Sequence, residues 1–259
     1  MNLEYKDINI YYTDNGNGNA VVLLHGFLEN SNMWNPFIPK LSKNHRIICI
    51  DLLGHGKTEC LGYVHTMELM AECVKVVLQN LNIFKATFIG HSMGGYVVLA
   101  FAEENPDMVN GLCLMNSTAE EDHLERKNNR DRAILAVKES HRLFVKMGIA
   151  NLFRPKNRTL FSENIKEIVE EALQTPLQGI IAALEGMKIR KNREHILQNP
   201  KLKKMMIISK KDPVLEFDSL INQAKKANVK VVEFPDGHMS HIENKSAFLI
   251  EIVHFIENM

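Results

Sequence analysis

Long apolar runs, an excess of one charge and a leader-like start are all missing from this sequence. No uncharged apolar run approaches the roughly 18 residues that a membrane span needs, so no transmembrane helix is predicted. The 31 basic and 31 acidic residues balance, and the net charge therefore predicts neither nucleic-acid binding nor attraction to an anionic membrane. The N-terminal residues 1–7 carry both signs of charge and no apolar stretch, unlike a signal peptide.

Patterns for disulfides, cofactors and metals are also scarce. The four cysteines show no C-x-x-C spacing: Cys49, Cys60, Cys73 and Cys113. Reduced thiols and the lack of an export signal predict a cytoplasmic protein. No G-x-G-x-x-G follows a strand, so no dinucleotide cofactor is expected. His238 and His241 have H-x-x-H spacing, but no nearby cysteine or carboxylate set completes a site, so no metal is predicted.

Short apolar runs alternate with helical periods along most of the chain. The runs lie at residues 20–24, 46–50, 86–89, 111–115, 205–208 and 229–234. Strands this uniformly apolar are expected where helices cover both faces of a parallel sheet. Helical periods lie at residues 67–81, 93–104, 215–227 and 246–257. A weaker run at 8–13 ends in a glycine-rich, hairpin-style turn at 14–18. We therefore predict a doubly wound, mostly parallel α/β sheet that starts with antiparallel strands.

One long interval breaks this rhythm. Between residues 118 and 199 the sequence shows no convincing strand, only charge-rich helical segments at 122–146, 164–174 and 177–187. An insertion of this length is usually functional or a subdomain of its own. We predict a helical cap at 118–199, inserted into a core made of residues 1–117 and 200–259.

The strongest chemical signal is a strand, a tight turn and a helix across residues 86–96, with the sequence GHSMG at 90–94. A serine needs a sharply turned backbone to project its hydroxyl clear of a sheet. Glycines two residues before and two after remove the Cβ atoms that would collide in such a turn. The alternative, a tight turn with an idle serine, explains less of this pattern. We interpret Ser92 as a nucleophile.

With these residues the chain resembles the α/β-hydrolase family, in its serine-nucleophile, cap-bearing branch of esterases, enol-lactonases and C–C bond hydrolases. Further matching marks are His25-Gly26-Phe27 after one strand, the sequence DLLGHG at 51–56 after the next, and Gly237-His238 after the last. The resemblance covers nearly the whole chain outside the insertion. It implies an eight-stranded sheet and the order nucleophile, acid, histidine along the chain.

By that resemblance, His238 is the general base and Asp212 the acid that orients it. The family often has glycine where this chain has Ser209, and Asp218 and Asp236 remain alternative acids. His241 offers a second imidazole, which we interpret as a surface or capping residue at the start of the last helix.

The family also supplies two N–H donors for the oxyanion, which here belong to Phe27 and Met93. The side chains at both positions are expected to be free to line the pocket. Three further histidines have structural interpretations: His25 shapes its loop, His55 belongs to a turn, and His91 occupies the variable position of the nucleophile turn.

The sequence thus predicts a cytoplasmic, cofactor-independent serine hydrolase that cleaves a small carboxylic ester or related acyl compound through an acyl-enzyme. A C–C bond hydrolase, an enol-lactonase, a thioesterase or a lyase of menaquinone synthesis would use the same residues, and a triad-retaining ligand sensor is the alternative from another class. The charged stretch at 120–132 is interpreted as a solvated helix face. Apolar cap residues expected to face the nucleophile, or to pack within the cap, are Phe144, Met147, Phe153, Leu177, Ile181, Leu184 and Met187.

Overall fold

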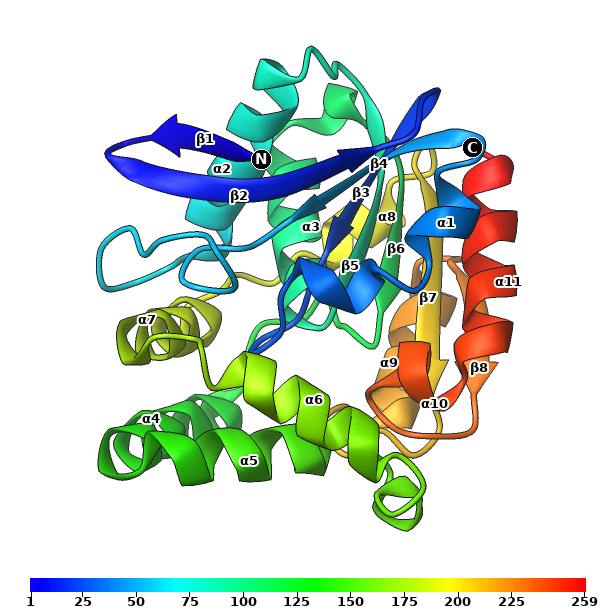
Figure 1. The fold of residues 1–259 in the computed structure, drawn as a ribbon. Coiled ribbons are helices and arrows are strands. Elements are labelled where there is room, and N and C mark those ends of the chain that lie inside the picture. Colours follow the sequence, from blue (N-terminus) through cyan, green and yellow to red (C-terminus); the bar gives the residue numbers. More distant parts are fainter.

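A twisted sheet of eight strands runs through the middle of the molecule in the computed structural model, which describes residues 1–259 (Figure 1). Its strand order is β1-β2-β4-β3-β5-β6-β7-β8. β2 is antiparallel to both of its neighbours, and every other neighbouring pair is parallel. The predicted doubly wound, mostly parallel α/β fold is therefore confirmed.

The apolar runs correspond to seven of the strands, with ends that differ by a few residues. The strands are β1 Asn2–Tyr5, β2 Ile8–Asn15, β3 Asn19–Leu24, β4 His45–Ile50, β5 Ala86–His91, β6 Val109–Met115, β7 Lys203–Ser209 and β8 Lys230–Phe234. β1 matches none of the expected runs. Its four residues, NLEY, are all exposed or half-buried, so this edge strand lacks the apolar signal of the others.

Helices cover both faces of the sheet, as the uniformly apolar strands predict. Along β3, Val22 and Leu24 belong to the larger core, with α2 (Met67–Asn80), α3 (Met93–Glu104), α8 (Glu194–Gln198) and α9 (Phe217–Lys226). Val21 and Leu23 face the smaller core, with α1 (Ile38–Leu41) and α11 (Lys245–Glu257). Figure 1 shows these two layers on opposite sides of the sheet. No helix has the length and apolar character needed to cross a bilayer.

Four helices form an insert between β6 and β7, across the carboxyl ends of the parallel strands (Figure 1). They are α4 Leu124–Glu139, α5 His141–Leu152, α6 Ser162–Ala172 and α7 Leu177–Lys188, and we call them the cap. The segment expected at 122–146 is two helices rather than one. Ser140, with φ −152° and ψ 87°, leaves the helical conformation and separates α4 from α5.

The turn at residues 14–18 does not form a hairpin. β2 and β3 are not neighbours, because β4 lies between them in the sheet. Gly16 and Gly18 have φ of +80° and +105°, and a Cβ on Gly16 would lie 2.4 Å from backbone oxygens of Ser42 and His45. The glycines therefore carry the chain closely past the segment that leads into β4. A turn signal is local, whereas strand pairing depends on where a later strand inserts.

Candidate active site

Ser92 lies on a sharp turn between β5 and α3, with φ 49° and ψ −113°. A Cβ added to Gly90 would lie 2.5 Å from backbone atoms in the first turn of α3, and one on Gly94 2.6 Å from backbone oxygens at the end of β3. Both positions therefore require glycine. The Ser92 backbone is held by its N–H, which donates to the Met115 carbonyl at 2.9 Å, and by its carbonyl, which accepts from Ser117 Oγ at 2.7 Å. A strained nucleophile turn is thus fixed against β6.

His238 and Asp212 come from two loops at the same edge of the sheet. Asp212 Oδ2 accepts a hydrogen bond from His238 Nδ1 at 2.8 Å, and the two side chains are 0% and 2% exposed. Asp212 Oδ1 accepts from the N–H groups of Val214 and Leu215 at 2.8 and 3.0 Å. Burial opposes ionisation, but His238 and these donors outweigh it and lower the pKa of Asp212. The result is a stable carboxylate against the His238 ring.

The two alternative acids lie elsewhere. Asp218 is exposed at the start of α9. Asp236 accepts hydrogen bonds from Arg154 Nη1 at 3.1 Å and from Asn157 Nδ2 at 2.9 Å. It thus connects the loop between β8 and α10 (Ser240–Glu243) to the segment between the cap helices α5 and α6. The structure therefore brings Asp212, and neither alternative, to His238.

Asn116 is a site residue that the sequence analysis missed. Its Nδ2 donates to Asp212 Oδ2 at 3.0 Å and to Ser209 Oγ at 2.9 Å, while its Oδ1 accepts from Ser240 Oγ at 2.6 Å. Ser209, where the family often has glycine, thus contributes an acceptor to the network that supports the acid. Asn116 directly follows the apolar run of β6, and a polar residue at a strand's carboxyl end was the available signal.

The two expected oxyanion donors differ in what their side chains do. The Phe27 N–H donates no hydrogen bond within the protein, and its ring lines the cavity that contains Ser92. Met93 is the first residue of α3, where N–H groups have no intrahelical partner and the helix dipole favours an anion. The Met93 side chain is fully buried in the larger core and does not line the pocket, contrary to expectation.

A cavity of about 270 Å³ contains Ser92 and His238. Of the seven apolar cap residues expected to face it, Phe144, Leu184 and Met187 line it. The other four do not, because Phe153 is fully buried in the core, Ile181 is half-buried against it, and Met147 and Leu177 are exposed. Further cap residues reach the cavity from α4 and α5: Arg126, Asn129, Arg130, Ala133, Gly148 and Leu152.

The charged stretch at 120–132 is not simply a solvated helix face. Asp122 is fully buried and contacts Arg190 Nη1 at 2.6 Å, the Arg130 side chain, and Arg126 Nε at 3.7 Å. Burial opposes ionisation of Asp122, but Arg130 and Arg190 outweigh it and lower the pKa of Asp122. Three arginines share one carboxylate, so the cavity wall of α4 keeps an excess of positive charge from Arg126 and Arg130.

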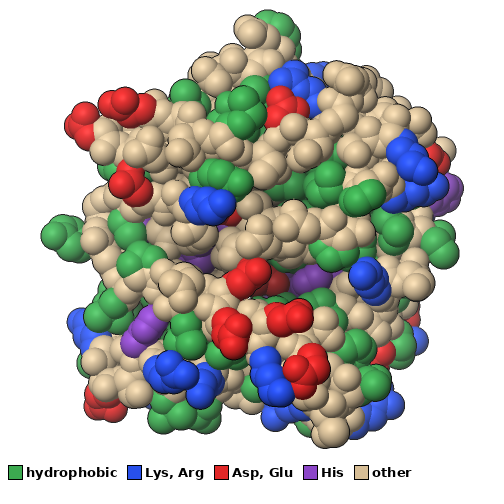
Figure 2. All heavy atoms as spheres, in the orientation of Figure 1, with side chains coloured by type: hydrophobic (Ala, Val, Ile, Leu, Met, Phe, Trp, Pro, Cys, Tyr) green, Lys and Arg blue, Asp and Glu red, His purple; other side chains and the backbone are tan.

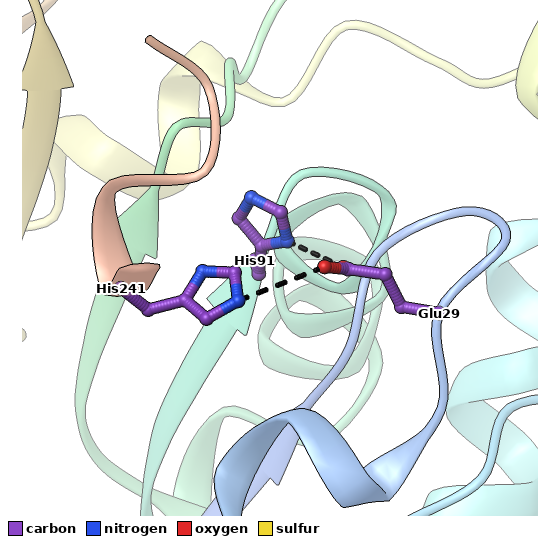
Figure 3. Close-up of side chains that lie close together, drawn as sticks. All are labelled: Glu29, His91 and His241. Atoms are coloured by element: carbon purple, nitrogen blue, oxygen red, sulfur yellow. Dashed lines mark hydrogen bonds and ion pairs between the residues drawn. The ribbon is translucent and has the colours of Figure 1, made fainter. Parts of the chain in front are cut away.

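A second buried cluster, formed by Glu29, His91 and His241, lies beside the nucleophile turn, and Glu29 and His91 also line the cavity of Ser92. Glu29 Oε2 is 2.6 Å from His91 Nδ1, and Glu29 Oε1 is 3.9 Å from His241 Nε2 (Figure 3). His241 is 3% exposed, so its interpretation as a surface or capping residue is wrong. The carboxylate belongs to Glu29, which is far from both histidines in sequence. No spacing pattern in the sequence therefore predicted this cluster.

The charge states of this cluster follow from burial and pairing. Burial opposes ionisation of Glu29, but His91, with smaller contributions from His241 and His25, holds its pKa at about 2. Burial likewise opposes protonation of His91, but Glu29 outweighs it and raises the His91 pKa. Burial lowers the pKa of His241 to about 3. An ionised Glu29 therefore pairs with a protonated His91 beside a neutral His241.

These three side chains also have the donor types of a divalent-metal site, with ligand atoms within 4.8 Å of one another. The separation of 2.6 Å between Glu29 Oε2 and His91 Nδ1 is that of a charge-assisted hydrogen bond, which places a proton between the two atoms. The geometry therefore fits an ion pair better than a set of metal ligands.

A second cavity, of about 300 Å³, lies between α6 and the core. Glu29 and His241 are part of its wall, and Glu167 and Glu171 contribute carboxylates from α6. Figure 2 shows acidic side chains gathered over this part of the surface, with a histidine visible in the hollow beside them. Asn30 Nδ2 donates to Glu171 Oε2 at 3.0 Å, which connects the cap to the loop that carries Glu29.

His25 and His55 lie among backbone groups, as their structural interpretations require. Leu52 N–H donates to His25 Nε2 at 2.8 Å, so His25 Nδ1 carries the proton toward the Gly26 carbonyl 2.7 Å away. His55 Nδ1 lies 3.0 Å from the Leu53 carbonyl, and burial lowers the His55 pKa to about 3. Both rings hold loops at the edge of the site.

Comparisons with known proteins agree with this fold. An uncharacterized protein of Mycobacterium tuberculosis is 35% identical over 102 residues, which are 39% of this chain and 30% of that protein. The chain thus matches less than a third of that curated relative's length. An esterase from Thermogutta terrifontis superposes with a TM-score of 0.91 at 28% identity, covering 97% of this chain and 94% of the esterase.

The fold is also shared with the enol-lactonase from Burkholderia xenovorans, with a TM-score of 0.91 at 23% identity and coverage of 99% and 100%. The family model described as "alpha/beta hydrolase fold" matches residues 19–245, which include the nucleophile turn, Asp212 and His238. The chain belongs to the alpha/beta hydrolase fold family.

Proposed function

We propose that this protein is a serine hydrolase that cleaves a small carboxylic ester or related acyl compound through a covalent acyl-enzyme. One observation carries the proposal: the buried Asp212–His238 pair and the strained Ser92 meet at a single cavity. A serine hydroxyl is weakly nucleophilic until a base takes its proton, and this arrangement supplies the base and the group that orients it.

The roles follow from the hydrogen bonds. His238 Nδ1–H donates to Asp212, which leaves Nε2 as the ring nitrogen that accepts the Ser92 proton. Ser92 Oγ then attacks the acyl carbon, and the N–H groups of Phe27 and Met93 stabilise the oxyanion. The protonated His238 gives its proton to the leaving alcohol, and afterwards activates the water that releases the acid. No cofactor enters these steps.

The cavity indicates the size and character of the acyl group. Its volume of about 270 Å³ suits a small substrate, and Phe144, Leu184 and Met187 offer an apolar wall. Arg126 and Arg130 add positive charge on the α4 side, which favours an acyl compound with a second, anionic group. The similarity to an esterase supports an ester as the substrate class, whereas lactones and C–C substrates would use the same residues.

A substrate panel tests the proposal. We expect turnover of short p-nitrophenyl esters, with a half-ester of a dicarboxylic acid, a lactone and a thioester as comparisons. Ser92→Ala should lose at least about 10³-fold in kcat, while the exposed Met147→Ala should retain activity. Repeated turnover supports an enzyme; a single acylation per molecule would indicate a ligand sensor, and full activity of Ser92→Ala would reject the mechanism.

A further inference from the structure

We infer that Glu29 and His91 are positioning residues that form a buried ion pair. The pair fixes the relative positions of three segments: the loop that carries the Phe27 N–H (the oxyanion loop), the turn that carries Ser92 and the loop that carries His238. The inference rests on the proposed function, because it concerns the same site. It assigns a role to two residues that do not belong to the proposed triad.

Both ring nitrogens of His91 lie within hydrogen-bond distance of an oxygen. Nδ1 is 2.6 Å from the Glu29 carboxylate, and Nε2 is 3.1 Å from the His238 carbonyl oxygen. Both neighbours are hydrogen-bond acceptors with no proton to give. A neutral imidazole would leave one nitrogen lone pair facing an oxygen lone pair at hydrogen-bond distance. Both nitrogens of His91 therefore donate, and the ring is an imidazolium.

Glu29 also contacts the oxyanion loop. Glu29 Oε2 also accepts from the Gly26 N–H at 2.7 Å, one residue before the Phe27 donor. A Cβ on Gly26 would lie 2.4 Å from this oxygen, so the carboxylate packs directly on the loop backbone. Leu28 has a φ of +63°, a conformation that a leucine rarely adopts. Glu29 thus holds a strained loop in place.

These contacts form one network. Gly26 N–H donates to Glu29, Glu29 accepts from His91, and His91 donates to the His238 carbonyl. His91 also directly precedes Ser92 in the chain. The ion pair therefore contacts the segments that supply an oxyanion donor, the nucleophile and the base, and the His91 ring also packs beside the His238 ring, with 5.1 Å between the ring centroids.

Both charges of the pair are buried, and this burial sets the cost of removing either one. The His91 and Glu29 side chains are 1% and 3% exposed, so neither charge is solvated if its partner is removed. His241 does not replace His91, because it lies 3.9 Å away and is held neutral by burial. Replacing one member should thus lower the stability of the folded protein more than replacing both. A simple packing role would not produce this result.

The test combines kinetics with a mutant cycle. Glu29→Gln and His91→Phe should each lower kcat about 10- to 100-fold with KM nearly unchanged, since misplacing an oxyanion donor costs less than the about 10²–10³-fold of losing one. The double variant should unfold at a higher temperature than either single variant. Its kcat should not fall below that of the worse single variant. Glu167→Gln, at an exposed carboxylate of the neighbouring cavity, is the matched control and should have the kcat and the unfolding temperature of the unmodified protein.

Two further measurements do not depend on turnover, so they separate this inference from the proposed function. Nitrogen-15 spectra of the unmodified protein at neutral pH should show both ring nitrogens of His91 protonated. Elemental analysis should find no stoichiometric transition metal. A neutral His91, a bound metal in place of its proton, kcat losses that multiply in the double variant, or unchanged kcat in both single variants would each overturn the inference.

Discussion

The carboxylate of Asp212 accepts four hydrogen bonds, from the His238 ring, the Asn116 amide and the backbone N–H groups of Val214 and Leu215. These donors fix its orientation and keep it ionised. The ring of His238 is thereby held with Nδ1 as its donor. The tautomer of the proposed base is thus set by a residue 26 positions earlier in the chain.

Replacing this carboxylate by an amide should cost far more than the lost charge alone. In Asp212→Asn the amide NH₂ can face His238 Nδ1, which favours the wrong tautomer and leaves no base toward Ser92. We expect kcat to fall by about 10³–10⁴-fold with the fold intact. Steady-state kinetics of the purified variant, with its circular dichroism spectrum as a folding check, provide the measurement.

Asp236→Asn is the matched control for this prediction. Asp236 pairs with Arg154 of the cap and does not contact His238, so its amide variant should keep kcat within a few-fold of the unmodified protein. The opposite ranking, an active Asp212→Asn and an inactive Asp236→Asn, would transfer the role of the acid to Asp236.

At the residue scale, the sequence predicts what is local and misses what is not. Ser92 was identifiable because its glycines stand two positions away, and His238 because a motif marks it. Glu29 and Asn116 carry no such motif. Glu29 meets His91 across 62 positions, and Asn116 meets Asp212 across 96, so only the folded chain brings them together.

Helix α7 supplies the apolar side of the cavity, and its sequence makes that possible. Gly186 packs against the backbone of His65, where a Cβ would lie 1.7 Å from the carbonyl oxygen, so the helix lies directly on the core. Leu184 and Met187 on this helix are each 3% exposed and line the cavity. The position of α7 therefore limits the length of the apolar group that the cavity can hold.

Shortening these side chains should change substrate preference before it changes chemistry. Leu184→Ala and Met187→Ala, made separately, should raise the kcat/KM of longer relative to shorter p-nitrophenyl esters by about tenfold, in the range that one or two methylene groups contribute in an apolar pocket. Met147→Ala, at an exposed position of α5, is the control. An unchanged chain-length profile in both α7 variants would assign specificity to the core loops.

At the element scale, periodicity located the long elements and failed at short or polar ones. α3 was predicted to the residue, because its apolar residues continue all round the helix and a strand precedes it. The break at Ser140 was missed because α4 is polar, with Ile134 and Val137 its only buried residues, so no change of period marks its end. β1 was missed for the same reason.

At the scale of the whole molecule, several histidine rings are buried. Four rings are held largely neutral by burial: the pKa of His25 is lowered, and those of His55, His65 and His241 are lowered to about 3, 4 and 3. Below pH 6.5 the unfolded chain takes up protons at these positions and the folded one does not. Stability is therefore lost as the pH falls, by up to about 1.4 kcal/mol per pH unit for each proton.

The Glu29–His91 ion pair makes stability depend on pH in both the acidic and the basic direction. The lowered pKa of Glu29 contributes stability above about pH 4.5 that is lost as the pH falls further, and the raised pKa of His91 contributes stability below pH 6.5 that is lost as the pH rises through the raised value. We predict that the unfolding temperature is highest near neutral pH and falls toward pH 5.

Two variants test which groups cause the loss of unfolding temperature toward pH 5. His55 is faced by His25, His65 and Glu29, and its Nε2 has no hydrogen-bond partner. His55→Leu should flatten the loss of unfolding temperature between pH 7 and 5, whereas His195→Gln, whose side chain is 58% exposed, should leave the slope unchanged. Equal slopes in all three proteins would show that other groups control acid unfolding.

The covalent intermediate at Ser92 is the central claim, and intact mass spectrometry after reaction with a fluorophosphonate tests it most directly. The unmodified protein should gain the mass of one phosphonyl group per chain, on the peptide that contains Ser92. Ser92→Ala should gain none, and Asp212→Asn should react far more slowly. Labelling of Ser92→Ala at the rate of the unmodified protein would contradict the account.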